Sequence, residues 1–436
     1  MLKNSFCSSP WIHIRLRYDG NYKVCRWSTD TATDLNIENY SLLEFYNSEV
    51  MKNFRLDLLN GEKSKGCNNC YYQESFDKIS GRQKQLLKSV VTKDDFNISM
   101  RSSPHFEMFK HSYENNGNSN YHPVDLQVDL GNYCNSACIM CSPDSSSRLE
   151  KDYTKLNQID NSLFKQHKKF TSWTRNPTLL NKFIENLKDL PNLKYIHLLG
   201  GETLYDPAFY AICDRLIELD LAKNIIMGTT TNGTIYNEKL EKIIPQFNQF
   251  HLGISIETVS ELNDYIRWPG KISDILSNIK KFKQLESHSN LFNSLRITPN
   301  IFTIYEFDQL AEYMIENNLT AESCNILYQP AQLKVELMPD DIRQETLEKF
   351  NNLINKYNLT QDPNNINIRS HTKSFQTISN TIIEYKNFIQ DYKVPSNVED
   401  LRYQLVKFLK AFEQLRSNRI TDYAPRFEKF LRDYGY

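Results

Sequence analysis

The middle of this 436-residue chain alternates short apolar segments with longer amphipathic ones, and this alternation limits the fold more than any other feature. Six apolar segments of strand length lie at 124–130, 194–199, 224–230, 250–257, 294–299 and 322–329. Segments between them repeat apolar residues with the period of one helical face, as at 177–190, 206–219, 272–287 and 304–317. Strands that alternate with helices form parallel sheets, because each helix returns the chain to the same end of the sheet. We therefore predict an α/β fold with a partial (β/α)6 barrel.

The segments on either side of the barrel differ from it in composition. A cysteine-containing segment with a hairpin signal comes first, a polar stretch that includes NNGNSN follows it, and a charged, aromatic-rich segment with helical periodicity ends the chain. We predict a small amino-terminal β-hairpin domain, a linker, the barrel and a helical carboxyl-terminal region, with these bounds: 1–80, 81–122, 123–330 and 331–436.

Charge and cysteine usage narrow the possible functions. The 52 lysines and arginines nearly balance the 53 aspartates and glutamates, which argues against a nucleic-acid partner. No apolar run approaches the length of a membrane span, and the amino terminus does not resemble a secretion signal, so we expect a cytoplasmic protein with no membrane partner. In that reducing compartment cysteines are expected to be metal ligands rather than disulfides, particularly in short clusters, and seven of the nine are clustered.

A C-x3-C-x2-C loop follows the first predicted barrel strand and consists of Cys134, Cys138 and Cys141. Such a short loop can direct three thiolates at one four-iron cluster, which leaves one iron without a protein thiolate. The alternative is a Cys3His zinc site, for which His122 is the nearest histidine in the sequence, although it precedes the strand.

Polar and glycine-rich segments also follow the next strands. Gly-Gly-Glu follows the second strand, Thr-Thr-Asn-Gly the third and Ser-Ile-Glu the fourth, and Arg267 and Asn300 come later. Because the carboxyl ends of parallel strands meet at one mouth, we expect these groups to share a ligand pocket with the cysteine loop.

The cysteine loop, with Gly-Gly-Glu one β/α unit later, resembles the signature of radical S-adenosylmethionine (SAM) enzymes. The resemblance implies a [4Fe–4S] cluster on the three cysteines, with SAM on the open iron. In that family the reduced cluster cleaves SAM, and the resulting 5′-deoxyadenosyl radical abstracts hydrogen from the substrate. The resemblance assigns these residues to SAM binding: Gly200, Gly201, Glu202, Thr231, Asn232, Ser255, Glu257 and Arg267.

A second cysteine set, comprising Cys7, Cys25, Cys67 and Cys70, precedes the barrel. A hairpin turn at 18–21 brings the ends of the first pair together, and C-x2-C supplies the second pair. In isolation this pattern is typical of a zinc ribbon. Its C-x12-G-x4-C half resembles the SPASM and twitch domains of radical enzymes, which implies a second, auxiliary cluster. Those domains usually follow the barrel, so the role of this one is left open by its position.

The two remaining cysteines stand alone. Cys213, in a predicted helix, is expected to be a buried apolar residue. Cys324, on the sixth strand, is a candidate hydrogen-atom donor at the barrel mouth.

Three functions remain open at this stage. The first is radical modification of a peptide or protein side chain, with a reductant such as flavodoxin or ferredoxin. The second is the same chemistry on a sugar, nucleotide or other small metabolite. The third is a non-catalytic iron–sulfur electron carrier or redox sensor, which would need no SAM pocket.

Overall fold

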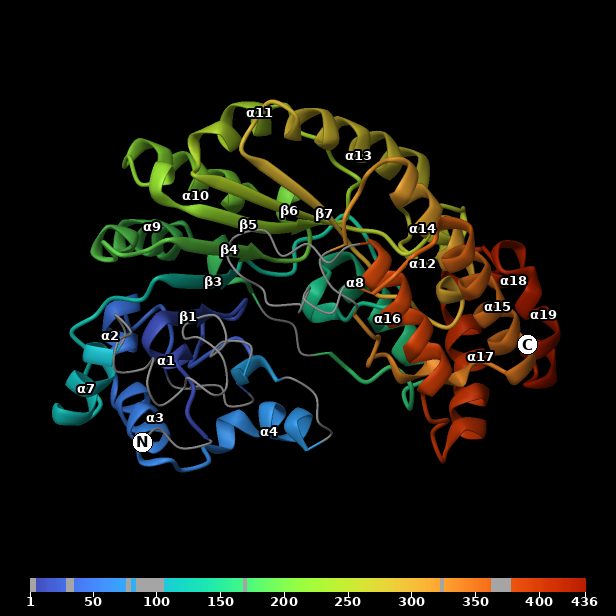
Figure 1. Cartoon of the computed structure of the whole chain (residues 1–436), viewed down its shortest axis with the longest axis horizontal. Helices are drawn as coiled ribbons and strands as arrows, with labels where there is room; N and C mark the ends of the chain where they lie inside the picture. Colours follow the sequence, from blue (N-terminus) through green and yellow to red (C-terminus); the bar gives the residue numbers. More distant parts are fainter. Residues whose placement is uncertain are drawn as a thin grey trace.

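The computed structural model describes residues 5–28, 35–75, 80–83, 106–167, 171–321, 325–361 and 378–436. A seven-stranded sheet in the order β2-β1-β3-β4-β5-β6-β7 forms its centre (Figure 1). All pairs from β1 to β7 are parallel, and only β2 is antiparallel to its neighbour β1. The strands are β1 (His13–Leu16), β2 (Tyr22–Lys23), β3 (Asp125–Asp129), β4 (Tyr195–Leu199), β5 (Ile226–Thr231), β6 (Gln249–Ser255) and β7 (Leu291–Arg296).

Helices join and cover these strands. In Figure 1 the amino-terminal helices lie beside β1, helices α9, α10, α11, α13 and α14 lie on the outer side of the sheet, and the carboxyl-terminal helices gather at its far end, next to α12. The α-helices are α1 (Ser9–Ile12), α2 (Leu42–Tyr46), α3 (Glu49–Asn60), α4 (Asn68–Glu74), α7 (Phe106–Glu114), α8 (Ser147–Ile159), α9 (Pro177–Asn186), α10 (Pro207–Glu218), α11 (Lys239–Ile243), α12 (Leu262–Ile266), α13 (Ile272–Glu286), α14 (Phe307–Glu316), α15 (Asp340–Tyr357), α16 (Ile378–Asp391), α17 (Val398–Arg416), α18 (Ile420–Tyr423) and α19 (Glu428–Asp433).

Five of the six predicted barrel strands are present as β3 to β7, and the predicted α/β class is confirmed. The strand predicted at 294–299 is β7, which begins and ends three residues earlier. β7 tolerates the polar residue Asn293 because the Asn293 amide donates to the Phe282 carbonyl at 2.7 Å. β7 ends before Thr298, whose N–H donates instead to the Glu257 carboxylate at 2.8 Å.

The sixth predicted strand, 322–329, is not found as such. Residues 322–324 lie outside the described residues, and 325–329 form no strand; an isolated parallel bridge joins Leu295 to Ala321 just before them. The sixth parallel strand is instead β1, from the predicted amino-terminal hairpin. The hairpin itself is confirmed, with Arg15 opposite Lys23 and Gly20 at a φ of +81° in the turn.

The register gives the sheet two different faces. Parallel sheets are usually apolar on both faces because helices cover both. Here one face is apolar and buried, with Ile14, Leu126, Ile196, Met227 and Phe250 in one row. The other face is largely polar. Toward the carboxyl ends of the strands, its rows contain first Arg15, Gln127, His197 and His251, and next Asp129, Leu199, Thr230 and Gly253. The last row contains Ser255 and Arg296.

Ion pairs join β1 and its hairpin to β3. Arg26 Nη2 lies 2.8 Å from Asp125 Oδ2, and Arg15 Nη2 lies 2.7 Å from Asp129 Oδ2. Both aspartates are at most 10% exposed in their side chains. The predicted amino-terminal domain and the predicted barrel therefore share one sheet and a partly buried ionic junction. The division of the chain at 80, 122 and 330 remains a proposal.

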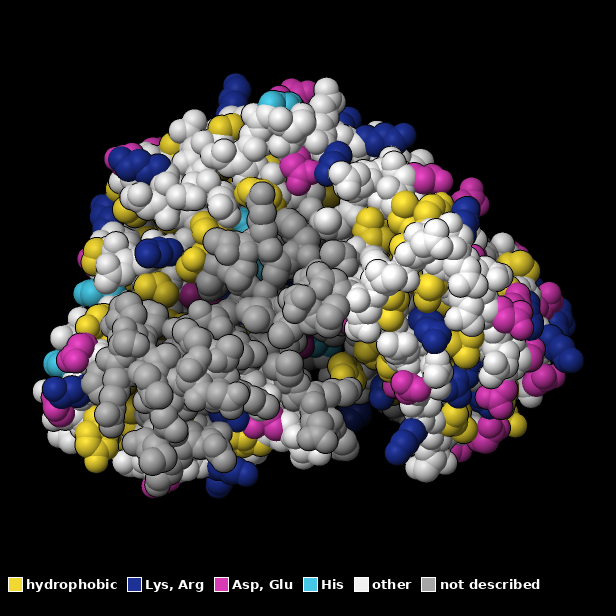
Figure 2. All heavy atoms as spheres, in the orientation of Figure 1, with side chains coloured by type: hydrophobic (Ala, Val, Ile, Leu, Met, Phe, Trp, Pro, Cys, Tyr) yellow, Lys and Arg dark blue, Asp and Glu magenta, His cyan; other side chains and the backbone are white. Residues whose placement is uncertain are grey.

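The carboxyl-terminal helices pack onto the barrel rather than forming a separate layer. α15 and α16 contact α14 and each other, and α17 contacts α8. Figure 2 shows side chains of both charge signs interspersed over this region. Among the described residues, no helix is both long and apolar enough to cross a membrane.

Replacing Asp125 with alanine should destabilise the junction, because the Arg26 guanidinium loses its carboxylate while remaining mostly buried. Removing one partner of a buried pair costs about 3 kcal/mol. Urea unfolding monitored by circular dichroism measures this loss. The control is Glu312→Ala, which breaks an exposed pair with Lys356 and should change little. Equal free energies of unfolding for the two variants would show that the junction contributes no stability.

Candidate functional site

Backbone hydrogen bonds hold the cysteine loop against the ends of neighbouring strands. The N–H of Glu202 donates to the Tyr133 carbonyl at 2.9 Å, directly before the first cysteine. The N–H groups of Ala137 and Ile139 donate to the carbonyls of Trp268 and Ile266 at 2.7 and 3.0 Å. Both edges of the loop are therefore fixed by backbone, which places its thiols independently of any bound group.

Side chains from the segments that follow β5 and β7 also hold this loop. The Asn232 amide donates to the side chains of Asn135 and Ser136 at 2.8 and 3.0 Å. Asn300, which follows β7, directs its amide at the sulfur of Met140 at 3.2 Å. Asn232 thus lies at the predicted site, but its amide nitrogen binds the cysteine loop.

The three loop thiols lie close together and face a positive charge. A hydrogen bond links Cys138 and Cys141; it lowers the pKa of Cys138 and raises that of Cys141. Burial, and then the charge of Cys138, raise the pKa of Cys134 to about 12. Burial lowers the pKa of Arg267, but the negative charges of Cys138 and Glu257 outweigh it, so that the net shift is upward. Three thiolates beside a buried guanidinium fit an anionic iron–sulfur cluster.

The Glu202 carboxylate joins the ends of β4 and β5. It accepts from the Thr231 hydroxyl at 2.7 Å, the Asn232 N–H at 2.5 Å and the Leu204 N–H at 3.0 Å. A carboxylate has about four acceptor positions, so one remains for a ligand. Burial raises the pKa of Glu202 to about 7, against the lowering effect of these donors.

A cavity of about 330 Å³ opens at the carboxyl ends of the strands, on the polar face of the sheet. It is lined by seven of the eight residues predicted for SAM binding: Gly200, Gly201, Glu202, Thr231, Asn232, Ser255 and Arg267. Glu257 is not among the lining residues; it lies behind Arg267, whose Nη1 is 2.9 Å from Glu257 Oε1. Burial raises the pKa of Glu257 to about 8 despite this partner. The structure thus brings the predicted residues together at one cavity.

Sequence reasoning did not assign several other residues of this cavity. Arg15 and Tyr18 come from the amino-terminal hairpin, Asp129 from β3 and Arg296 from β7. Oδ1 of Asp129 is buried and has no hydrogen-bond partner among the described residues. A signal for these residues was present, because a strand of a parallel sheet with polar residues at every second position indicates an open polar face.

The four amino-terminal cysteines form a second group of buried thiols. Burial, and then the charge of Cys25, raise the pKa of Cys7 to about 12, while burial raises that of Cys25 to about 11. The charges of Cys7, Cys25 and Cys70 add to burial in raising the pKa of Cys67. Backbone N–H groups donate to three of these sulfurs, from Ser9 to Cys7, from Trp27 and Ser28 to Cys25, and from Arg82 to Cys70.

This donor set fits a metal group, because four neighbouring thiols, three of which receive N–H bonds, are suited to carry thiolate charge. In the described parts of the chain, no three or more His, Cys, Asp or Glu side chains are arranged to hold a single metal ion. A four-iron cube is wider than one ion and needs more widely spaced ligands. The assignment of both cysteine sets to clusters remains a proposal.

Other predicted residues lie apart from these sites. Cys213 is fully buried in α10. Cys324 lies outside the described residues. His122 precedes β3, so the whole strand, at about 3.3 Å per residue, separates it from the cysteine loop. This distance argues against His122 as a fourth ligand.

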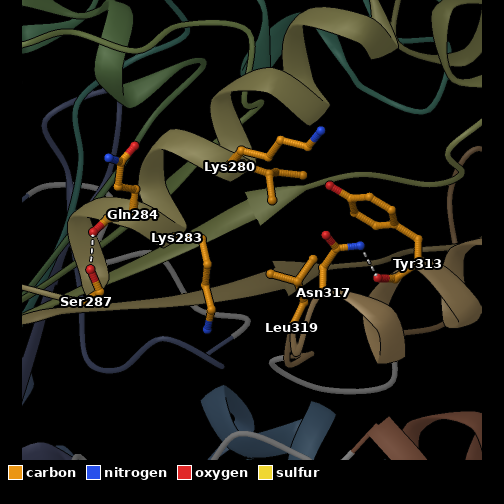
Figure 3. Close-up of a pocket in the computed structure, with 8 residues that line it drawn as sticks. Lys280, Lys283, Gln284, Ser287, Tyr313, Asn317 and Leu319 are labelled. Atoms are coloured by element: carbon orange, nitrogen blue, oxygen red, sulfur yellow. Dashed lines mark hydrogen bonds between the residues drawn. The ribbon is translucent and has the colours of Figure 1, made fainter.

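A second, smaller pocket of about 230 Å³ lies on the outer side of the barrel, between α13 and α14 (Figure 3). Lys280, Lys283 and Tyr313 line it, and no predicted site residue does. The Asn317 amide donates to the Tyr313 carbonyl there at 2.8 Å (Figure 3). This pocket is on the helical side of the sheet, away from the cysteine loop.

Comparison with known proteins identifies two domains. A family model described as the radical SAM superfamily matches residues 128–312, and one described as the SPASM iron–sulfur cluster-binding domain matches residues 7–71. The chain therefore carries a radical SAM domain over residues 128–312. It carries its SPASM domain before the barrel, as predicted.

Individual relatives are distant. An uncharacterised protein of Methanocaldococcus jannaschii is 27% identical in an alignment of 274 residues that covers 56% of this chain and 56% of that protein. This chain thus spans about half the length of that relative. Among solved structures, anSMEcpe with bound AdoMet is similar with a TM-score of 0.39 and 17% identity over 54% of this chain and 63% of that one. Streptococcus suis SuiB bound to S-adenosylmethionine has a TM-score of 0.33 and 13% identity, over 82% of this chain and 71% of that one.

Replacing Gly201 with alanine should disturb the cysteine loop, because the new Cβ would lie 2.6 Å from the carbonyl oxygens of both Asn132 and Tyr133. Such overpacking against backbone costs about 1–3 kcal/mol. We expect a lower unfolding free energy and less iron bound after reconstitution. Gly200→Ala is the matched control, since its Cβ would lie 3.4 Å from the nearest atom. If both variants bound iron like the wild type, the close approach at Gly201 would not matter for the loop.

Proposed function

We propose that this protein reductively cleaves SAM at a [4Fe–4S] cluster held by Cys134, Cys138 and Cys141, and that it acts on a peptide or protein side chain. When bound, the cluster supplies the electron that splits SAM into methionine and a 5′-deoxyadenosyl radical, which takes a hydrogen atom from the substrate. The observation that carries the proposal is the cavity beside the three-thiol loop, lined by seven of the eight residues expected to bind SAM.

The residues of the cavity have separate roles in this proposal. Gly200 and Gly201 let the backbone approach the ligand, because neither carries a side chain. The remaining acceptor position of Glu202 takes a hydrogen bond from the methionine amino group. Arg267, with its Nε buried and without a partner among the described residues, donates to the methionine carboxylate, and Glu257 holds it in place.

The small volume of the cavity favours a larger substrate of which only one side chain enters. At about 330 Å³ it is near the lower limit of small-molecule pockets, which hold about 300–1,000 Å³. A pocket of that size has room for SAM and little more. A single side chain reaching in from a peptide needs less space than a whole metabolite. The amino-terminal SPASM domain fits this substrate class by its resemblance to domains of peptide-modifying radical enzymes.

We further propose that Cys7, Cys25, Cys67 and Cys70 hold an auxiliary cluster, with no open coordination position. The electron for SAM cleavage comes from a reductant such as flavodoxin or ferredoxin. We place the enzyme in the cytoplasm, where reducing conditions keep the thiols of both cysteine sets available as ligands.

Anaerobic reconstitution followed by dithionite and SAM should yield 5′-deoxyadenosine, measured by liquid chromatography. Replacing Cys134, Cys138 and Cys141 with alanine should abolish this product but leave the iron of the amino-terminal site. Cys213→Ala is the control, because that buried thiol belongs to neither set. A fully iron-loaded protein that forms no 5′-deoxyadenosine would instead support the electron-carrier function.

Deuterium transfer into 5′-deoxyadenosine from labelled peptides, but not from metabolites, would identify the substrate class.

SAM affinity should increase between pH 6 and pH 8 through Glu202. Burial raises its pKa to about 7, so the carboxyl is mostly protonated at pH 6 and mostly ionised at pH 8. The ionised fraction, and with it the affinity for an ammonium, rises by about tenfold over this range. Titration with SAM, followed by the change in the electron paramagnetic resonance (EPR) signal, measures the affinity.

Glu202→Gln is the reference for this titration, because SAM's own amino group titrates equally in both proteins. The ratio of the two affinities should therefore rise with pH. A constant ratio would show that Glu202 does not bind the amino group.

A further inference from the structure

Helix α17 brings an arginine from the carboxyl-terminal region to the cysteine loop. Nη2 of Arg416 donates to the Ala137 carbonyl at 2.6 Å, on the residue directly before Cys138. The same nitrogen lies 3.3 Å from Asp152 Oδ2 on α8. The Arg416 side chain is only 3% exposed, so the contact is inside the protein.

Aromatic rings enclose this guanidinium. Its carbon lies 4.4 Å from the ring centre of Phe412 and 5.0 Å from that of Trp268. The Trp268 carbonyl accepts the Ala137 N–H at 2.7 Å. Arg416 and Trp268 therefore bind the carbonyl and the N–H of the same residue. Nε of Arg416 is buried and has no partner among the described residues. The guanidinium is therefore held rigidly beside the loop in a region of low polarity.

A buried positive charge at this position acts on the loop sulfurs. Arg416 is bonded to the residue directly before Cys138, and its charge is close enough to that sulfur to act on it electrostatically. Asp152 offsets part of the Arg416 charge, but its side chain is 23% exposed and solvent screens it more. The charges of Arg416 and Asp152 should therefore both act electrostatically on a group bound at the three thiols, with opposite effects.

We propose that Arg416 is a positioning residue that raises the reduction potential of the loop cluster, with Asp152 opposing it. This inference rests on the proposed function, because it requires a cluster on Cys134, Cys138 and Cys141. Reduction adds one electron from flavodoxin, ferredoxin or dithionite, and no proton or bond changes. The reduced cluster carries one more negative charge, so a nearby cation stabilises it relative to the oxidised cluster.

The test is an anaerobic redox titration of the reconstituted full chain, in which EPR monitors the signal that is absent from the variant lacking all three loop cysteines. In Arg416→Gln the reduction equilibrium should become about tenfold less favourable, which is about 59 mV for a one-electron couple. In Asp152→Asn the potential should move the other way, by less. The double variant should lie between the single ones.

Two further variants separate charge from shape. Arg416→Lys keeps the charge and should shift the potential less than Arg416→Gln does. Arg419→Gln removes the same charge from an exposed position three residues later, and should leave the potential unchanged.

Opposite shifts in Arg416→Gln and Asp152→Asn are the expected result, since loss of packing alone would not reverse sign between them. Shifts in the same direction, or none beyond that of Arg419→Gln, would overturn the inference. If Arg416→Gln does not fold, Asp152→Asn decides alone: a higher potential supports the inference and an unchanged one overturns it. If no EPR signal depends on the loop cysteines, the proposed function itself has failed.

Discussion

The pairing of β3 with β4 is the constraint on which the site depends. Asp129 lies opposite Leu199, and the Leu130 N–H donates to the Leu199 carbonyl at 2.6 Å. Beyond the strands, the Glu202 N–H continues the contact by donating to Tyr133. Two motifs more than sixty residues apart in the chain therefore become one surface. A shift of this register by one residue would turn Glu202 and the cysteine loop to different faces.

Local patterns were sufficient to predict the centre of the fold. β3 to β6 and the helices between them have strong periodicity, and the cysteine spacing is itself short-range, so the sequence predicts both. The strand predicted at 294–299 begins three residues later than β7, which includes the polar Asn293; that side chain is accepted inside the strand because it bonds the Phe282 carbonyl of α13. A side chain satisfied by a distant carbonyl carries no signal in the strand's own sequence. The same reasoning applies to Arg416, whose partner Ala137 is 279 residues away.

The polar face of the sheet is a different case, because its signal was local. Arg15, Asp129 and Arg296 all lie in predicted strand or hairpin segments, at alternate positions with apolar neighbours. The recognisable motifs lie in the loops after the strands and do not include these residues. The sequence carries no signal for the pairing of β1 with β3, because any exposed edge of a parallel sheet can accept a strand. The register alone brings Arg15 to the cavity.

The position of the SPASM domain before the barrel acquires a physical meaning from this pairing. Because the hairpin enters the sheet next to β3, the segment between Cys7 and Cys25 pairs directly with the strand that ends at the cysteine loop. Arg15 pairs with Asp129 on β3 and also donates to the Arg26 carbonyl, directly after Cys25, at 3.0 Å. The same guanidinium thus contacts the backbone of one cysteine set and lines the cavity beside the other. A domain attached after β7 would enter from the opposite edge of the sheet and would lack this direct connection.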